Sequence, residues 1–159
     1  MPISTNGAIV FESPNVSITP RTTRQDFISS TLYSISEPLN QNVPWSRYGF
    51  RPAVASGEQY AGDICFRSGA IYSVALSSLR PEFGTSWNDM SAEKERARHE
   101  FHKRLLQDII KRPPDEVIAR GQDQRDADIQ FRFSWGTVSA CTDFKSGGCD
   151  IFIKYEAGR

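Results

Sequence analysis

The stretch Ile129-Gln-Phe-Arg-Phe-Ser-Trp135 carries a large apolar side chain at every second position. This period of two is typical of a β-strand that buries one face. Gly136 interrupts the pattern and Val138 resumes it in the opposite phase, which predicts a bulge or sharp bend. The turn-forming run Lys145-Ser-Gly-Gly148 then leads into a second alternating segment that ends at Tyr155. We therefore predict a long, bent antiparallel hairpin at the centre of a sheet.

Upstream segments predict more strands of the same kind. Ser-Gly pairs separate three strand-like runs at the spacing of hairpin turns: 47–55, 58–67 and 70–79. In the third run, alternation places Tyr72 on the buried face together with Val74 and Leu76. Two short apolar segments on either side of Ser13-Pro14-Asn15 predict an N-terminal hairpin. These runs indicate an antiparallel meander.

Two helices are expected. Thr23 followed by Asp26 has the form of a capping box, which predicts a short helix over residues 23–32. Ser91 is a suitable N-cap for a long helix that continues to about Lys111. Apolar side chains spaced by four residues, joined by two neighbours, predict the face of this helix that packs on the sheet: Ala97, Phe101, Leu105 and Ile109, with Leu106 and Ile110.

Together these elements predict a single α+β domain over residues 1–159. We expect a curved antiparallel sheet of about five to seven strands, a meander plus the long C-terminal hairpin, packed on the long helix. The short N-terminal helix completes the fold. Residues 34–46 are interpreted as a loop, and residues 115–119 as one short helical turn.

Composition and charge argue against several classes of protein. The chain has 19 basic and 19 acidic residues, whereas a dedicated nucleic-acid-binding protein usually has a basic surplus. No run of 18 apolar residues is present, so we expect no transmembrane helix and no membrane partner. The first seven residues have neither the basic nor the apolar segment of an export signal. We therefore expect a cytoplasmic protein.

The cysteines give no sign of a cofactor. Cys141 and Cys149 flank the C-terminal turn and could be cross-strand neighbours, while Cys65 is distant in the sequence. Unpaired thiols are the expectation in a cytoplasmic chain. The spacing matches no zinc site, and we expect no bound metal or cofactor.

His99 and His102 are the only histidines, three residues apart on the long helix and one turn after Glu95. The H-E-x-x-H spacing of a zinc protease is absent. We expect both histidines on a solvated helix face. The enzymatic alternative is a small hydrolase or nuclease in which they act as acid and base, with Arg98 or Lys103 on a phosphate.

No nucleophile elbow and no glycine-rich phosphate loop occurs in the sequence. We therefore assign no catalytic residue. Asp63 is expected to face solvent, on the side of its strand opposite Ile64 and Phe66. The charged segment 115–128 is a further candidate surface, one that could present acidic groups to a basic partner.

Two irregular segments, 43–48 and 80–89, concentrate aromatic and arginine residues. Such residues dominate protein interfaces, and loops often carry recognition residues. We predict that these segments bind a partner through six side chains: Trp45, Arg47, Tyr48, Phe83, Trp87 and Asp89.

Three parts of the chain resemble a class of bacterial proteins: residues 23–27 (Thr-Arg-Gln-Asp-Phe), residues 86–93 (Ser-Trp-Asn-Asp-Met-Ser-Ala-Glu), and the C-terminal segments 133–138, 143–147 and 151–155. The class comprises small immunity proteins that protect bacteria from secreted or contact-delivered toxins. The resemblance implies a non-enzymatic cytoplasmic protein that binds and neutralises a cognate toxin. The alternatives are the hydrolase or nuclease using His99 and His102, and an adaptor or secretion chaperone for an effector.

Overall fold

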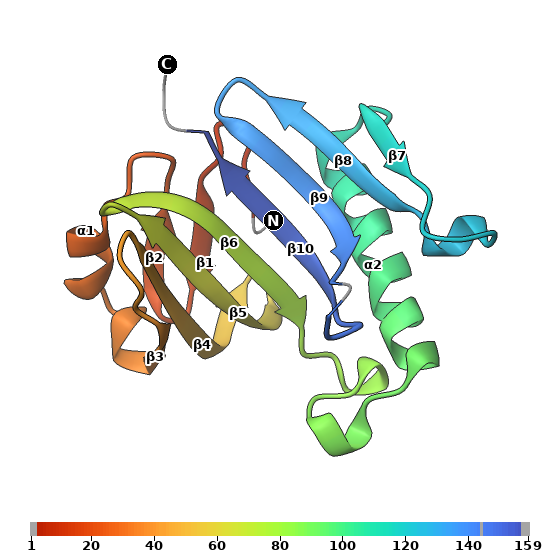
Figure 1. The fold of residues 1–159 in the computed structure, drawn as a ribbon, viewed down its shortest axis with the longest axis horizontal. Helices are drawn as coiled ribbons and strands as arrows, with labels where there is room; N and C mark the ends of the chain where they lie inside the picture. The colour runs from red at the N-terminus through yellow and green to blue at the C-terminus, as the bar shows by residue number, and fades with distance from the viewer. Residues whose placement is uncertain (1–2, 144, 157–159) are drawn as a thin grey trace.

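The computed structural model describes residues 3–143 and 145–156. Its main sheet consists of eight antiparallel strands in the order β3-β4-β5-β6-β10-β9-β8-β7, and a separate hairpin pairs β1 with β2 (Figure 1). The strands are β1 (Ile9–Glu12), β2 (Asn15–Ile18), β3 (Ser36–Asn40), β4 (Trp45–Ala55), β5 (Glu58–Arg67), β6 (Ala70–Ser78), β7 (Glu116–Ile118), β8 (Asp128–Phe133), β9 (Gly136–Thr142) and β10 (Cys149–Tyr155).

The helices are α1 (Arg24–Ile28) and α2 (Ala92–Ile110), with short 3₁₀ segments at Tyr33–Ile35, Pro81–Phe83, Trp87–Asp89 and Gln124–Asp126. The predicted α+β class with one large antiparallel sheet is confirmed, and the sheet has one strand more than the upper end of the predicted range. No helix in the described ranges is long and apolar enough to cross a bilayer.

The sheet is made of two similar halves. Each half is a helix followed by four antiparallel strands, α1 with β3 to β6 and α2 with β7 to β10. The last strands of the halves, β6 and β10, pair with each other at the centre. Both helices contribute to one hydrophobic core, Phe27 from α1 and Leu106 from α2. The helices therefore lie on the same side of the sheet.

The core fills the space between this side of the sheet and α1, α2 and the β1–β2 hairpin. Alternate residues such as Ile64 and Phe66 on β5, and Ile151 and Ile153 on β10, are completely buried there. Each such side chain contributes roughly 1.5–3 kcal/mol through its removal from water. In Figure 1, α2 passes behind β8 and β9, and the hairpin lies behind β4 to β6. Among the described residues, no helix lies over the side of the sheet that faces the viewer.

The bend predicted at Gly136 is a hairpin turn. β8 ends at Phe133, which pairs directly with Gly136 at the start of β9. Gly136 has φ 148°, and a Cβ atom there would lie 2.0 Å from the Lys154 carbonyl oxygen. The close approach of β10 therefore requires glycine. The C-terminal region forms three strands, and β10 is the one at the centre of the sheet.

The predictions for segments 34–46 and 115–119 are wrong in part. Each contains a short strand, β3 and β7 respectively, at an edge of the sheet. These strands have little alternation of their own and form because a longer neighbour offers hydrogen bonds. Side chains protect the rest of the β8 edge. Arg112 donates to the main-chain carbonyl of Arg132 at 2.7 Å, and Asp115 accepts from the main-chain N–H of Arg132 at 2.6 Å. A blocked edge resists pairing with other chains.

The helix caps are as predicted. Thr23 and Asp26 form a complete capping box, although α1 ends at Ile28 rather than near residue 32. The hydroxyl of Ser91 accepts from the N–H of Lys94 at 3.2 Å, and Lys111 closes α2 with a left-handed φ of 54°.

The buried face of α2 is the predicted one only in part. Leu106 lies in the core, and Leu105 and Ile110 pack against it. Ala97 is exposed and Phe101 is only half-buried. The face that packs on the sheet is mainly polar: Glu95, Arg98, His99, His102, Lys103 and Leu106. These groups can be buried because strands and loops offer hydrogen bonds. Glu95 accepts from the Cys149 N–H at 2.9 Å, and Arg98 donates to the Phe83 carbonyl at 3.0 Å.

Candidate functional site: the open face of the sheet

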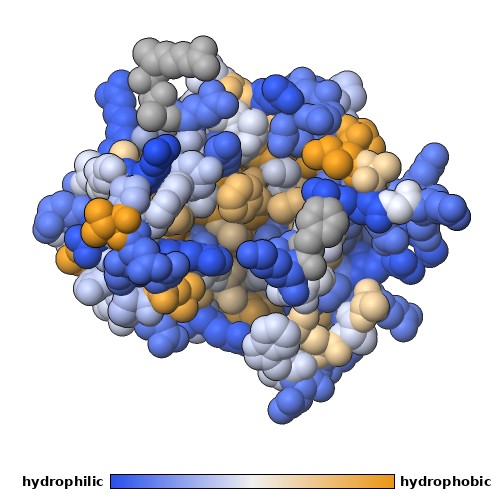
Figure 2. Space-filling model, viewed as in Figure 1, coloured by the Kyte–Doolittle hydropathy of each residue, from blue (hydrophilic) through white to orange (hydrophobic). Residues whose placement is uncertain are grey.

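The side of the sheet opposite the helices, called the open face below, has a floor of both small and larger residues. One row crosses four strands as directly paired residues: Asp63, Ala75, Phe152 and Ser139. Ser73 and Ala75 are only 4% and 8% exposed although no element covers them, because longer neighbours surround them. A depression of about 560 Å³ lies here. Figure 2 shows a pale orange strip down the middle of this face between blue regions.

Aromatic and basic side chains gather at one end of the open face. Trp45 and Tyr72 meet edge to face, with ring centroids 4.9 Å apart. Arg67 lies over the Trp45 ring at 5.5 Å, and Lys154 lies over the Tyr72 ring at 5.6 Å. Cation–π contacts of this kind hold long basic side chains in place. We call these four residues the aromatic–basic cluster.

Tyr72 belongs to this cluster because of a bulge. The pairing of β5 with β6 shifts between Cys65 and Phe66, so that Cys65 faces Ser73 while Phe66 faces Ile71. Tyr72 is the extra residue, and its ring contacts Trp45 on the open face. The prediction that it shares the buried face with Val74 is therefore wrong. A bulge re-aims a side chain in this way, and strict alternation could not anticipate it.

Two carboxylates lie at the centre of the open face. Asp63 forms an ion pair with Arg47, Oδ2 to Nη2, at 2.6 Å, which confirms that it faces away from the core. Asp150 lines the same depression. Burial raises the pKa of Asp150 to about 6, the negative charge of Asp63 adds to the shift, and a hydrogen bond from Ser77 opposes it.

Trp87 marks the other end of the open face. It is 78% exposed and borders a second depression of about 390 Å³ together with Arg51, Ala61 and Ser77. Asp89 follows it and forms an ion pair with Lys94. The two irregular segments predicted to bind a partner thus flank one continuous surface.

Two of the six predicted contact residues are not on this surface. Tyr48 is buried beneath Arg24, whose Nε donates to its hydroxyl at 2.8 Å. Phe83 is buried against Phe101 at 5.4 Å between ring centroids. They cannot make the direct contacts predicted for them. Alternation along β4 directs Tyr48 inward, and packing against α2 directs Phe83 inward. Trp45, Arg47, Trp87 and Asp89 remain accessible.

The predicted solvation of the histidines is wrong. His99 and His102 are 1% and 0% exposed. His99 Nε2 lies 3.3 Å from Asp128 Oδ1, and His102 Nε2 accepts from the Ser78 N–H at 3.3 Å. Burial lowers the pKa of His102 to about 3, so its imidazole is neutral at physiological pH. A substrate has no path to either ring in this conformation.

The three cysteines, Cys65, Cys141 and Cys149, are unpaired. Cys149 is buried on the helix side, whereas Cys141 lines the open-face depression, so adjacent strands direct the two sulfurs to opposite sides of the sheet. Burial raises the pKa of Cys141 to about 12, which keeps it as the unreactive thiol. Within residues 3–143 and 145–156, no three His, Cys, Asp or Glu side chains are grouped to hold a metal ion.

The charged segment 115–128 does not present free acidic groups. Asp115 pairs with Arg112, Asp123 with Arg125, and Asp126 with Arg96. Asp128 is buried with His99 and Arg120. Local arginines thus neutralise these carboxylates.

The chain was compared with protein-family models, with curated proteins and with solved structures, and nothing matched it.

Proposed function

We propose that this protein is a non-enzymatic binding protein of the cytoplasm that holds a protein partner on its open face. We further propose that the partner is a toxin, which the bound protein neutralises. The observation that supports this most is the uncovered face itself: a large sheet packs one side on helices and leaves the other side open, with aromatic, arginine and carboxylate side chains along it.

The chemistry of the open face favours a protein over a small ligand. The surface extends from Trp45 to Trp87 and joins two shallow depressions rather than one closed cavity. Exposed aromatic rings and arginines are typical anchors of protein interfaces. Charges of both signs, such as Arg47 and Asp63, fix the orientation of a partner. The aromatic–basic cluster is the expected centre of binding energy.

The immunity function rests on the resemblance of the sequence segments and on the absence of a nucleophile motif. The hydrolase alternative depended on accessible histidines, and both are buried. A secretion adaptor would use the same surface as an immunity protein. These two functions therefore differ only in the activity of the bound partner. Growth of cells that produce the partner distinguishes them.

The test is capture of partners from a lysate of the source cells with the tagged protein, followed by growth assays. We expect one protein to be retained by the wild type, and its production alone to arrest growth. Production together with the wild type should restore growth. A captured partner that is harmless when produced alone would overturn the toxin proposal and favour the adaptor.

A matched pair of variants tests the surface. Arg67 lies in the aromatic–basic cluster, whereas Arg104 is exposed on α2 at the other side of the molecule. We expect Tyr72→Ala and Arg67→Ala to weaken binding of the captured partner by about tenfold or more. Arg104→Ala should leave the affinity unchanged. The opposite ranking would contradict binding through the open face.

A further inference from the structure

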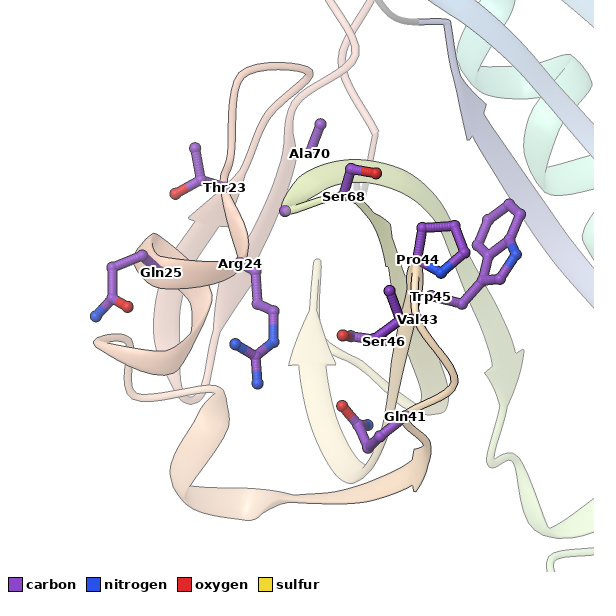
Figure 3. Close-up of a pocket in the computed structure, with 11 residues that line it drawn as sticks. Thr23, Arg24, Gln25, Gln41, Val43, Pro44, Trp45, Ser46, Ser68 and Ala70 are labelled. Atoms are coloured by element: carbon purple, nitrogen blue, oxygen red, sulfur yellow. The ribbon is translucent and has the colours of Figure 1, made fainter.

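An open cavity lies between the start of α1 and the loop before β4, and Trp45 of the aromatic–basic cluster is part of its lining. It has a volume of about 950 Å³. In Figure 3 the Ser46 hydroxyl is directed toward the side on which the Arg24 side chain lies, and Val43 and Pro44 lie on the loop at the rim. This size is within the range of small-molecule sites.

Arg24 places a fixed positive charge in this cavity. Its main-chain N–H donates to the Gly69 carbonyl at 2.8 Å. The Nε donates to the Tyr48 hydroxyl at 2.8 Å, and the guanidinium lies over the Tyr48 ring at 5.8 Å. Among the described residues, no hydrogen bond or ion pair occupies its two Nη atoms. A guanidinium held in this way is pre-organised to bind two oxygens of one anion.

The remaining lining supplies no compensating charge. Its eleven described residues include no aspartate or glutamate. The nearby Asp26 accepts hydrogen bonds from the main chain and hydroxyl of Thr23 at 2.8 Å each, and so is held in the capping box. The hydroxyls of Ser46 and Ser68 make no hydrogen bond to any described residue and can donate to a ligand.

The rim of the cavity is apolar. Val43 is 97% exposed, and Pro44 beside it is also exposed. The loop that carries them is nevertheless anchored, since the Pro44 carbonyl accepts from the Ser68 N–H at 2.8 Å. An anchored loop that presents apolar side chains next to a charged group suits a ligand with both an anionic and an apolar part.

We propose that this cavity binds a small organic anion, with its carboxylate or phosphate group on the Nη atoms of Arg24 and its apolar part against Val43 and Pro44. Ser46 and Ser68 complete the polar contacts. Trp45 lines both the cavity and the aromatic–basic cluster. The inference does not depend on the proposed function, because Arg24 belongs to the cavity alone and Tyr72 to the cluster alone, so variants of each test the two sites separately.

The test is an NMR titration of the ¹⁵N-labelled protein with acetate, phosphate and phenyl phosphate at constant ionic strength. We expect saturable shifts at the main-chain amides of Arg24, Gln25 and Gly69. Phenyl phosphate should bind more tightly than phosphate, because its ring adds the apolar contact. The stronger of acetate and phosphate identifies the preferred anionic group. Shifts that stay linear in concentration for all three probes would overturn the proposal.

Variants make the test specific. Val43→Glu places a carboxylate at the rim without disturbing a packed side chain and should weaken phenyl phosphate binding at least fivefold. Arg24→Met should abolish the saturable shifts. Arg21→Met is the control, since Arg21 is exposed outside the lining. Equal affinities of the wild type and the Val43→Glu variant would also count against the site, even if Arg24→Met failed to fold.

Discussion

Single residues determine where this sheet turns and which charges it tolerates. Gly136 is the clearest case, since its neighbour strand leaves no room for a side chain. Its positive φ and the closeness of Lys154 are separate constraints. Gly121 shows the effect of a positive φ alone. Gly121 has a similar φ of 143°, but a Cβ atom at this position would meet no other atom within 4 Å among the described residues.

We expect Gly136→Ala to lower the free energy of unfolding by about 3–5 kcal/mol, because it adds a steric clash to backbone strain. Gly121→Ala should cost only about 1–2 kcal/mol, since strain alone is present there. Chemical denaturation of both variants measures the difference. Equal losses would show that the strands move apart to accept the methyl group.

Asp150 makes stability depend on pH with an unusual sign. Its pKa is raised from 3.8 to about 6 in the folded protein, so the folded state resists its ionisation. The destabilisation is absent below about pH 4, grows as pH rises and is complete above about pH 6. We expect Asp150→Asn to gain stability relative to the wild type on going from pH 4 to pH 7.5, by up to about 3 kcal/mol.

Asp143 is the matched control for this prediction. Hydrogen bonds from Ser146 and Lys145 lower its pKa, so ionisation of Asp143 stabilises the fold, and the stabilisation is lost as pH falls. Because this loss occurs below about pH 4, the stability of Asp143→Asn relative to the wild type should hardly change between pH 4 and pH 7.5. Urea unfolding at both pH values measures the two variants, and equal changes would contradict the assigned environments.

At the scale of elements, α2 shows that the buried face of a helix can be polar. Arg98 forms a buried ion pair with Glu95 and also binds the carbonyl groups of Phe83 and Gly84. Removing one member leaves the other charge buried without a partner. We expect Arg98→Met to cost about 3–5 kcal/mol, measured by denaturation.

Arg96 provides the comparison, two positions away on the same helix. It is exposed and pairs with Asp126 across the surface, where water and salt screen the charges. Arg96→Met should leave stability unchanged within experimental error. In a double-mutant cycle, Glu95→Gln combined with Arg98→Met should cost less than the sum of the single changes. Additive costs would show that the buried pair does not act as a unit.

The sequence predicted elements better than it predicted faces. Long alternating runs located β4, β5 and β6, and side-chain caps located both helices, because these signals are local. The edge strands β3 and β7 were missed because their pairing depends on a neighbour. The buried face of α2 was predicted only in part, because Glu95 and Arg98 are also buried there, against partners on elements distant in sequence.

The candidate surface was predicted only in part, again because local signals are visible in the sequence and contacts between distant strands are not. Trp45, Arg47 and Trp87 were selected by residue type and loop position, and the fold leaves them accessible. Tyr72 and Lys154 were missed, because only the bulge in β6 and the pairing of β6 with β10 bring them together. A composition of aromatic and basic residues is visible in a sequence, whereas their meeting on one side of a sheet is not.

For the whole molecule, the arrangement of two similar halves explains why an open face exists. Each half brings its helix to the same side, so that side closes into a core and the other stays free. The seam between the halves, β6 against β10, lies beneath the open-face depression. A partner bound there would contact both halves at once.

The most direct test is hydroxyl-radical footprinting of the protein with and without its captured partner. Binding through the open face should protect Trp45, Tyr72 and Phe152 from modification. Tyr33, which is exposed beside α1 and away from this face, should be modified equally in both samples. Protection of Tyr33 with continued modification of Tyr72 and Phe152 would place the partner elsewhere and contradict the open face as the binding surface.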